Sequence, residues 1–172
     1  MNDDTRTKTD YADLLKYDVK QAWEDENNWK ELCPDAEKGS FSWEALDIGA
    51  VYRVTLCRKI DIDGFAVCKS DFAVAGTIVA NSIISVGKTK NLAQRMQQHF
   101  TPSKINSNRL LTRLKNLFPE ADGRRWLSRM ILERALKIEY FPIPDEFWWQ
   151  RDLLESYGKA VHCCLFDLEI EH

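Results

Sequence analysis

The segment between residues 83 and 100 constrains the fold of this 172-residue chain more than any other stretch. It opens with the apolar run Ile83-Ile84-Ser85-Val86, passes through Gly87 and a lysine-bearing turn, and ends in a helical pattern that reaches Phe100. Apolar runs bounded by glycine are typical of buried strands, and apolar residues at spacings of three and four are typical of helices. The sequence therefore predicts a strand, a glycine turn and a helix in direct succession.

Two side chains on the predicted helix suit the binding of a phosphate. Arg95 and His99 are four residues apart, so they lie on one face of the helix, one turn from each other. An arginine can bind two phosphate oxygens and stabilise developing charge, and an imidazole can orient a water molecule or act as an acid. From the residues alone, a surface arginine in a helical ion pair and a partly buried, hydrogen-bonded histidine remain the alternatives.

Charge is unevenly distributed along the chain, whose net charge is −3. Residues 1–47 contain 13 acidic and 6 basic residues, whereas residues 88–134 contain 11 basic and 3 acidic residues. A basic block of this size is typical of a surface that binds a polyanion. The alternative is a set of solvated helical faces.

Cysteine usage and hydropathy indicate where such a chain works. The five cysteines are odd in number and follow no zinc-binding spacing. No apolar run approaches the roughly 18 residues of a membrane helix, and the acidic N-terminus lacks the apolar core of a signal peptide. We therefore expect a cytoplasmic protein without a membrane partner.

The first part of the chain divides at residue 46. We expect residues 1–46 to form an acidic, mainly helical N-terminal extension packed on the core, and residues 47–172 to form one domain. Residues 48–57 predict a strand, Asp63-Gly64 predicts a hairpin turn with a return strand after it, and residues 72–79 predict a further strand.

The second part alternates helices with a strand. Helices are predicted over residues 108–118, 124–135 and 145–161, with a strand over 136–141 and a closing strand over 163–168. Asp145 is predicted to cap the last helix. Its expected buried stripe consists of Trp149, Leu153, Tyr157, Ala160 and Val161.

Glu155 and Tyr52 are further candidates for a chemical role. A carboxylate beside an apolar helix stripe needs a partner, and either Arg95 or a divalent metal would serve, since Mg²⁺ often binds only one or two protein carboxylates. Tyr52 lies on the predicted strand 48–57, and its hydroxyl reaches the glycine turn if that strand pairs with residues 83–86. The alternatives are a surface glutamate and a core tyrosine.

Several of these segments together match a known pattern. Ala50-Val51-Tyr52, after Gly49, and Ser85-Val86-Gly87 stand where two tripeptide motifs lie, and the run from Gly87 to Leu92 is followed by Arg95 and His99. Glu155, which follows the strand Ile138-Glu139-Tyr140-Phe141-Pro142, stands in the place of a late metal-binding glutamate. Over residues 48–162 the chain therefore resembles the GIY-YIG nuclease family.

This resemblance implies both a fold and an activity. The fold is α/β (α+β), with a small, mostly antiparallel central sheet flanked by helices. The activity is metal-dependent endonucleolytic hydrolysis of DNA phosphodiester bonds, of a restriction or phage type. The oligomeric state, monomer or homodimer, stays open.

The resemblance also implies roles for individual residues. Arg95 would stabilise the scissile phosphate, and Glu155 would hold Mg²⁺ or Mn²⁺. Tyr52 would act as the base or orient the attacking water, Lys88 and His99 would assist, and Ser85 stands in the second motif. We expect DNA to be bound by the following side chains: Lys88, Lys90, Lys104, Arg109, Arg113, Arg124 and Arg125.

The chain departs from the family pattern in three places. Ser85 replaces a tyrosine, Ala50 replaces a glycine, and the loop between the two tripeptides is longer. Ser85 leaves open altered chemistry, a replacement phenol at Tyr140 or Tyr157, or loss of activity. A catalytically impaired DNA- or protein-binding module is therefore the alternative function, and an inhibitor with an acidic, DNA-like face is a third. The enzyme hypothesis predicts that Arg95, Glu155 and Tyr52 meet around one water-lined hollow.

Overall fold

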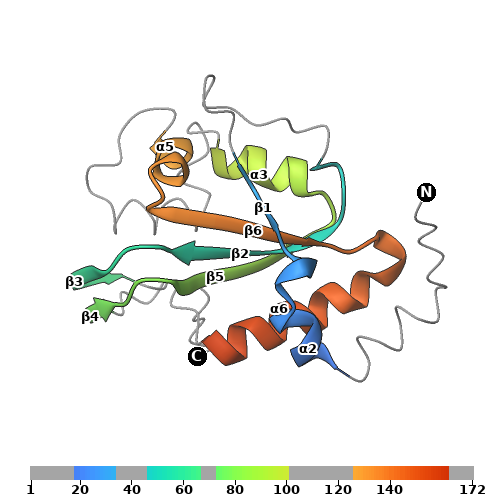
Figure 1. Ribbon diagram of the computed structural model, residues 1–172, viewed down its shortest axis with the longest axis horizontal. Coiled ribbons are helices and arrows are strands. Elements are labelled where there is room, and N and C mark those ends of the chain that lie inside the picture. Colours follow the sequence, from blue (N-terminus) through green and yellow to red (C-terminus); the bar gives the residue numbers. More distant parts are fainter. Residues whose placement is uncertain (1–17, 34–45, 67–72, 101–125, 163–172) are drawn as a thin grey trace.

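A four-stranded antiparallel sheet lies at the centre of the computed structural model, which describes residues 18–33, 46–66, 73–100 and 126–162 (Figure 1). Its strand order is β1-β6-β2-β5. These strands are β1 (Lys30–Glu31), β2 (Ala50–Leu56), β5 (Ser82–Thr89) and β6 (Leu136–Pro142). A separate antiparallel pair extends from one end, formed by β3 (Ile60–Ala66) and β4 (Ala73–Ile78).

Helices cover both faces of the sheet (Figure 1). One face carries α3 (Leu92–Phe100) and α5 (Trp126–Leu132), and the other carries α6 (Trp148–His162) and α2 (Val19–Glu24). Two 3₁₀ turns, η1 (Glu26–Asn28) and η4 (Asp145–Phe147), precede β1 and α6. The predicted α+β class, with a small antiparallel sheet flanked by helices, is confirmed. Within the described ranges no helix is long and apolar enough to span a membrane.

Each face of the sheet has its own buried cluster, because successive side chains on a strand point to opposite faces. On the α3 face, Tyr52 and Val54 of β2 pack with Leu92 and Met96 of α3. On the α6 face, the neighbouring residue Val51 packs in a second cluster, together with Val86, Trp23 and Leu154. The face to which a side chain of β2 or β5 points therefore determines which helices it contacts.

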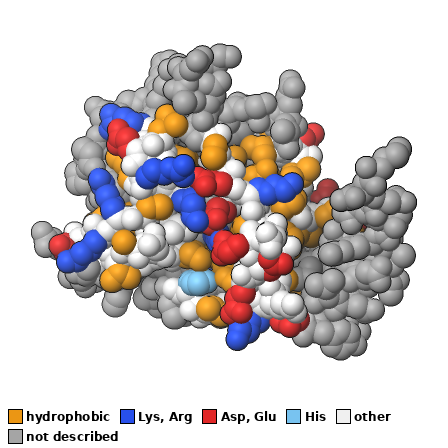
Figure 2. Space-filling view, in the orientation of Figure 1, with side chains coloured by type: hydrophobic (Ala, Val, Ile, Leu, Met, Phe, Trp, Pro, Cys, Tyr) orange, Lys and Arg blue, Asp and Glu red, His pale blue; other side chains and the backbone are white. Residues whose placement is uncertain are grey.

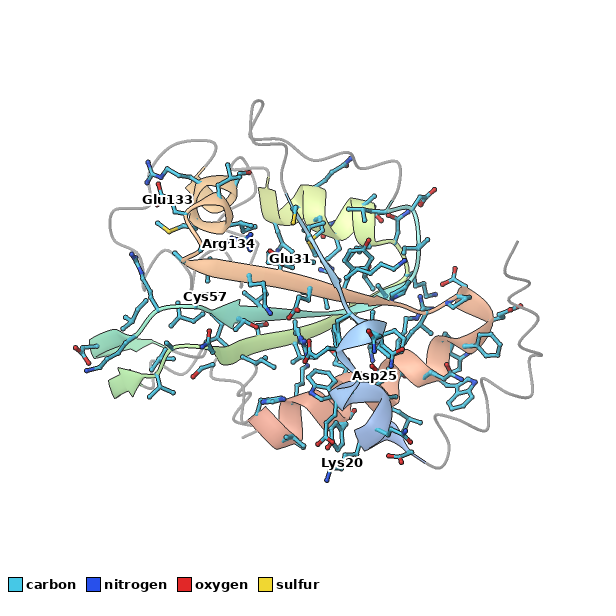
Figure 3. All side chains as sticks on the ribbon, viewed as in Figure 1. Lys20, Asp25, Glu31, Cys57, Glu133 and Arg134 are labelled. Carbon is cyan, nitrogen blue, oxygen red and sulfur yellow. The ribbon has the colours of Figure 1, made fainter. Side chains whose placement is uncertain are left out.

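The described part of the predicted N-terminal extension is built into this architecture. β1 pairs with β6, and Arg134 after α5 binds Glu31 of β1 at 2.7 Å (Figure 3). The indole Nε1 of Trp23 donates to Nε2 of His162 at the end of α6, at 3.0 Å. Residues 18–33 thus extend the sheet and pack against α6.

Buried Arg53 ties this N-terminal segment to the centre of the sheet. Its guanidinium lies 4.2 Å from the ring centroid of Trp29 and binds both Glu139 and Glu26 at 2.8 Å. Burial opposes ionisation of Glu139, but the hydrogen bonds from Arg53 and Lys137 outweigh it and lower the pKa of Glu139. The network satisfies a charge pair that would be costly to bury alone.

The predicted hairpin turn at Asp63-Gly64 is wrong. β3 runs straight through these residues, with a shift of register between Asp63 and Phe65, and it pairs with β4. Gly64 therefore lies at a bulge within a strand.

The predicted buried stripe of the last helix is wrong at Leu153, Ala160 and Val161, which are exposed, whereas Tyr157 packs against the α6-face cluster. The residues of α6 that are buried are Gln150, Arg151, Leu154 and Gly158, whereas Leu153 and Val161 are exposed. Asp145 does not cap this helix but lies in η4, and its carboxylate binds Arg151. The pattern of apolar residues therefore predicted a face of α6 that is adjacent to the face that is buried in the structure.

Candidate functional site

Tyr52 and Gly87 face each other across the paired strands β2 and β5. A Cβ atom on Gly87 would overlap the Tyr52 ring at its hydroxyl-bearing end. Only glycine leaves room for the ring there, which is a physical reason for glycine in the second motif. The Tyr52 hydroxyl therefore lies over β5, at one edge of the sheet as described.

His99 contacts the Tyr52 hydroxyl from the α3 side. The distance from Tyr52 Oη to His99 Nε2 is 3.3 Å, and the two residues are 7% and 4% exposed. The helix that carries His99 is fixed at its start, because Asn91 Oδ1 accepts from the backbone N–H of Gln94 at 2.8 Å. A buried phenol and a buried imidazole in this contact can share a proton.

Arg95 and Ser85 belong to the same face. Arg95 is half-buried one turn before His99, and its Nη1 lies 3.5 Å from Gln98 Oε1, a long contact for a hydrogen bond. Ser85 is buried opposite Val54, two residues before Gly87. The α3 face thus gathers Tyr52, His99, Ser85 and Arg95, and we call these four residues the α3-side group.

A second group lies on the α6 face. Lys88 stands opposite Val51, and its Nζ binds Asp152 Oδ1 at 2.8 Å and Glu155 Oε2 at 3.2 Å. Lys159 binds the other oxygen of Glu155 at 3.1 Å. The hydrogen bond with Asp152 raises the pKa of Lys88, burial opposes this, and Glu155 adds to it, so the ammonium stays charged. We call these four residues the α6-side group.

Arg151 positions the helix that carries Glu155. Its buried guanidinium donates to the carbonyl of Thr89 at 3.1 Å and binds Asp145 Oδ1 at 2.8 Å. A Cβ atom on Gly49 would overlap this guanidinium. The glycine before the first motif therefore makes room for an arginine that ties α6 to the end of β5, one turn before Glu155.

The prediction that Arg95, Glu155 and Tyr52 meet around one hollow is wrong, because the structure places these residues in two groups. Tyr52 meets His99 and Lys88 meets Glu155, but Glu155 lies on the opposite face of the sheet from Tyr52. The two groups nevertheless border consecutive residues, Gly87 and Lys88, of a strand at the sheet edge. A ligand that contacts both groups must approach β5 at this edge.

Of the two possible replacement phenols for Ser85, Tyr140 lies on the same face of the sheet as Ser85, with β2 between them. Tyr140 stands opposite Tyr52 on β6 and packs on the same cluster. Tyr157 packs against Trp23 on the other face, with ring centroids 6.1 Å apart. Burial raises the pKa of Tyr140. Its hydroxyl is therefore favoured in the protonated form, as a hydrogen-bond donor, and not as a phenolate base.

The carboxylates of the α6-side group suit a hard divalent cation. The described residues contain no cluster of three or more His, Cys, Asp or Glu side chains that would hold a metal. Asp152 and Glu155 are one helical turn apart and share the Lys88 ammonium, which acts as a stand-in cation between them. Mg²⁺ that keeps most of its water needs no more than such a pair.

The predicted DNA-binding residues are only partly visible. Lys88 and Lys90 lie exposed where β5 turns into α3. On the face shown in Figure 2, the Lys and Arg side chains that are described are interspersed with Asp and Glu side chains. The remaining predicted positions lie outside the described residues: Lys104, Arg109, Arg113, Arg124 and Arg125.

Comparisons with protein-family models, curated proteins and solved structures find no match for this chain. The resemblance to GIY-YIG nucleases therefore rests on the residues quoted above.

Proposed function

We propose that this chain is a metal-dependent DNA endonuclease of the GIY-YIG type, with its site at the edge strand β5. The observation that carries the proposal is the placement of two chemically distinct groups on consecutive residues. The Tyr52–His99 contact lies over Gly87, and the Lys88–Glu155 ion pair begins at the next residue. Proton transfer and charge stabilisation are the two requirements of phosphodiester hydrolysis.

Each side chain has a role in this proposal. Arg95, weakly held by Gln98, binds the scissile phosphate and offsets the charge that develops on it. Tyr52 takes a proton from the attacking water while His99 accepts the Tyr52 proton at Nε2. Asp152 and Glu155 would hold Mg²⁺ or Mn²⁺, which supplies Lewis-acid stabilisation of the phosphate when bound. Arg151 is a positioning residue, because it acts by fixing α6.

The test is cleavage of supercoiled plasmid DNA with Mg²⁺ or Mn²⁺. Glu155→Gln and Arg95→Ala should each lower the cleavage rate at least about 100-fold. Arg129→Ala and Glu24→Gln serve as matched controls, because each removes one charge from an exposed ion pair on another helix. Wild-type rates in Glu155→Gln or Arg95→Ala would exclude the assigned site.

A catalytically impaired binding module is the second candidate function. Two observations favour it: Ser85 replaces the second-motif tyrosine, and both oxygens of Glu155 are bound by lysines. Such a module would bind duplex DNA with a marked salt dependence and leave it intact with Mg²⁺, Mn²⁺ and Co²⁺. DNA binding without cleavage in all three metals would establish this alternative.

A further inference from the structure

Lys88 occupies a position that a divalent cation would also take. Its Nζ lies 2.8 Å from Asp152 Oδ1 and 3.2 Å from Glu155 Oε2. Mg²⁺ binds carboxylate oxygens at about 2.0–2.1 Å, so a metal between these carboxylates would replace the ammonium instead of joining it. Repulsion between the two cations adds to this exclusion.

The ion pairs of Lys88 can be broken readily. The side chain of Lys88 is 43% exposed and that of Asp152 is 45% exposed, so water competes for both charges. Lys88 also has a flexible four-carbon stem. Glu155, in contrast, is 14% exposed and keeps a second partner, Lys159, at its other oxygen. Glu155 therefore stays in place when Lys88 leaves.

We infer that Lys88 is a gate that couples metal binding to DNA binding at this site. In the free protein its ammonium excludes the metal from Asp152 and Glu155. A DNA phosphate at the β5 edge draws the ammonium away, since Lys88 directly follows Gly87 and lysine binds phosphate as a point charge. The inference rests on the proposed function and adds an order to it, because each ligand strengthens the binding of the other.

The test measures Mn²⁺ affinity from the electron paramagnetic resonance signal of free Mn²⁺, first without DNA. Lys88→Met should bind Mn²⁺ about tenfold more tightly than the wild type, and Lys88→Arg, which keeps the charge, should match the wild type. Lys59→Met is the matched control, because Lys59 has one exposed carboxylate partner, Asp61, beyond the far end of β2. Glu155→Gln should weaken binding in the Lys88→Met background.

The titration is then repeated with short duplex DNA. DNA should raise the Mn²⁺ affinity of the wild type about tenfold more than that of Lys88→Met, because only the wild type has an ammonium to displace. Mn²⁺ bound by DNA itself contributes equally to both and cancels in the comparison. Equal affinities of the wild type and Lys88→Met without DNA would overturn the gate, as would no response to DNA. If DNA and Mn²⁺ binding are coupled but plasmid is not cleaved, the gate is supported and the endonuclease function is excluded. If plasmid is cleaved but the two binding events are not coupled, the endonuclease function is supported and the gate is excluded.

Discussion

Replacing Gly158 by alanine should destabilise the protein, although alanine is the better helix former. A Cβ atom at position 158 would overlap the indole ring of Trp23. The indole has little freedom to move, because its Nε1 donates to His162 and Trp29 donates to its backbone carbonyl at 2.9 Å. Overpacking of a buried ring costs about 1–3 kcal/mol, and the gain in helix propensity offsets about 1 kcal/mol. The difference is a net loss of up to about 2 kcal/mol, with about 1 kcal/mol as the central expectation.

Urea unfolding followed by tryptophan fluorescence and circular dichroism measures this loss. In thermal unfolding, a loss of about 1 kcal/mol should lower the melting temperature by about 2–4 °C for a chain of this size. Ser156→Ala is the control, because Ser156 is exposed on the same helix and its replacement should stabilise by a few tenths of a kcal/mol. A Gly158→Ala protein about 1 kcal/mol more stable than the wild type would refute the reasoning, since it would mean that Trp23 does not pack on α6.

Three further changes have defined outcomes. Tyr52→Phe keeps the ring on Gly87 and removes the hydroxyl, so plasmid cleavage should fall at least about 100-fold. Because buried His99 loses one hydrogen-bond partner, stability should fall by only about 1 kcal/mol, and a much larger loss would contradict this. Burial and the charge of Arg53 lower the pKa of His162 in the folded protein. Neutral His162 therefore contributes stability that is fully present above its unfolded-state pKa near 6.5 and is lost as the pH falls through its folded-state pKa. His162→Gln should flatten this dependence in urea unfolding between pH 5 and 8. Glu139→Gln leaves Arg53 without its buried carboxylate and should cost about 3 kcal/mol, whereas a neutral effect would show that the pair is dispensable.

The sequence predicts the secondary structure correctly where residues close together in sequence determine it. β5 and α3 follow one another as residues 83–100 predict, and Asn91 caps the helix through its side chain. β6 places Leu136, Ile138 and Tyr140 on one face, as the alternation of its residues predicts. The sequence predicts that the Tyr52 hydroxyl reaches the glycine turn if β2 pairs with β5, and the structure contains this pairing.

The buried face of α6 is determined by tertiary contacts that local sequence patterns do not reveal. A hydrophobic pattern scores Arg151 as a surface residue, yet its guanidinium is buried because Gly49, Thr89 and Asp145 accommodate it. On the same helix, Leu154 packs in the cluster of Val51 and Val86, and Gly158 packs against Trp23. Leu153 is exposed. A glycine before a strand and an arginine on an apolar helix were visible separately, but nothing in sequence joined them.

The division of the candidate site into two groups follows from the strand itself. Gly87 and Lys88 are consecutive in β5, so their side-chain positions must point to opposite faces of the sheet. A ring that lies on Gly87 and a carboxylate that binds Lys88 are therefore separated by the thickness of one strand, whatever the helices do. Because β5 is at the sheet edge within the described residues, a phosphodiester can approach both faces only around that strand.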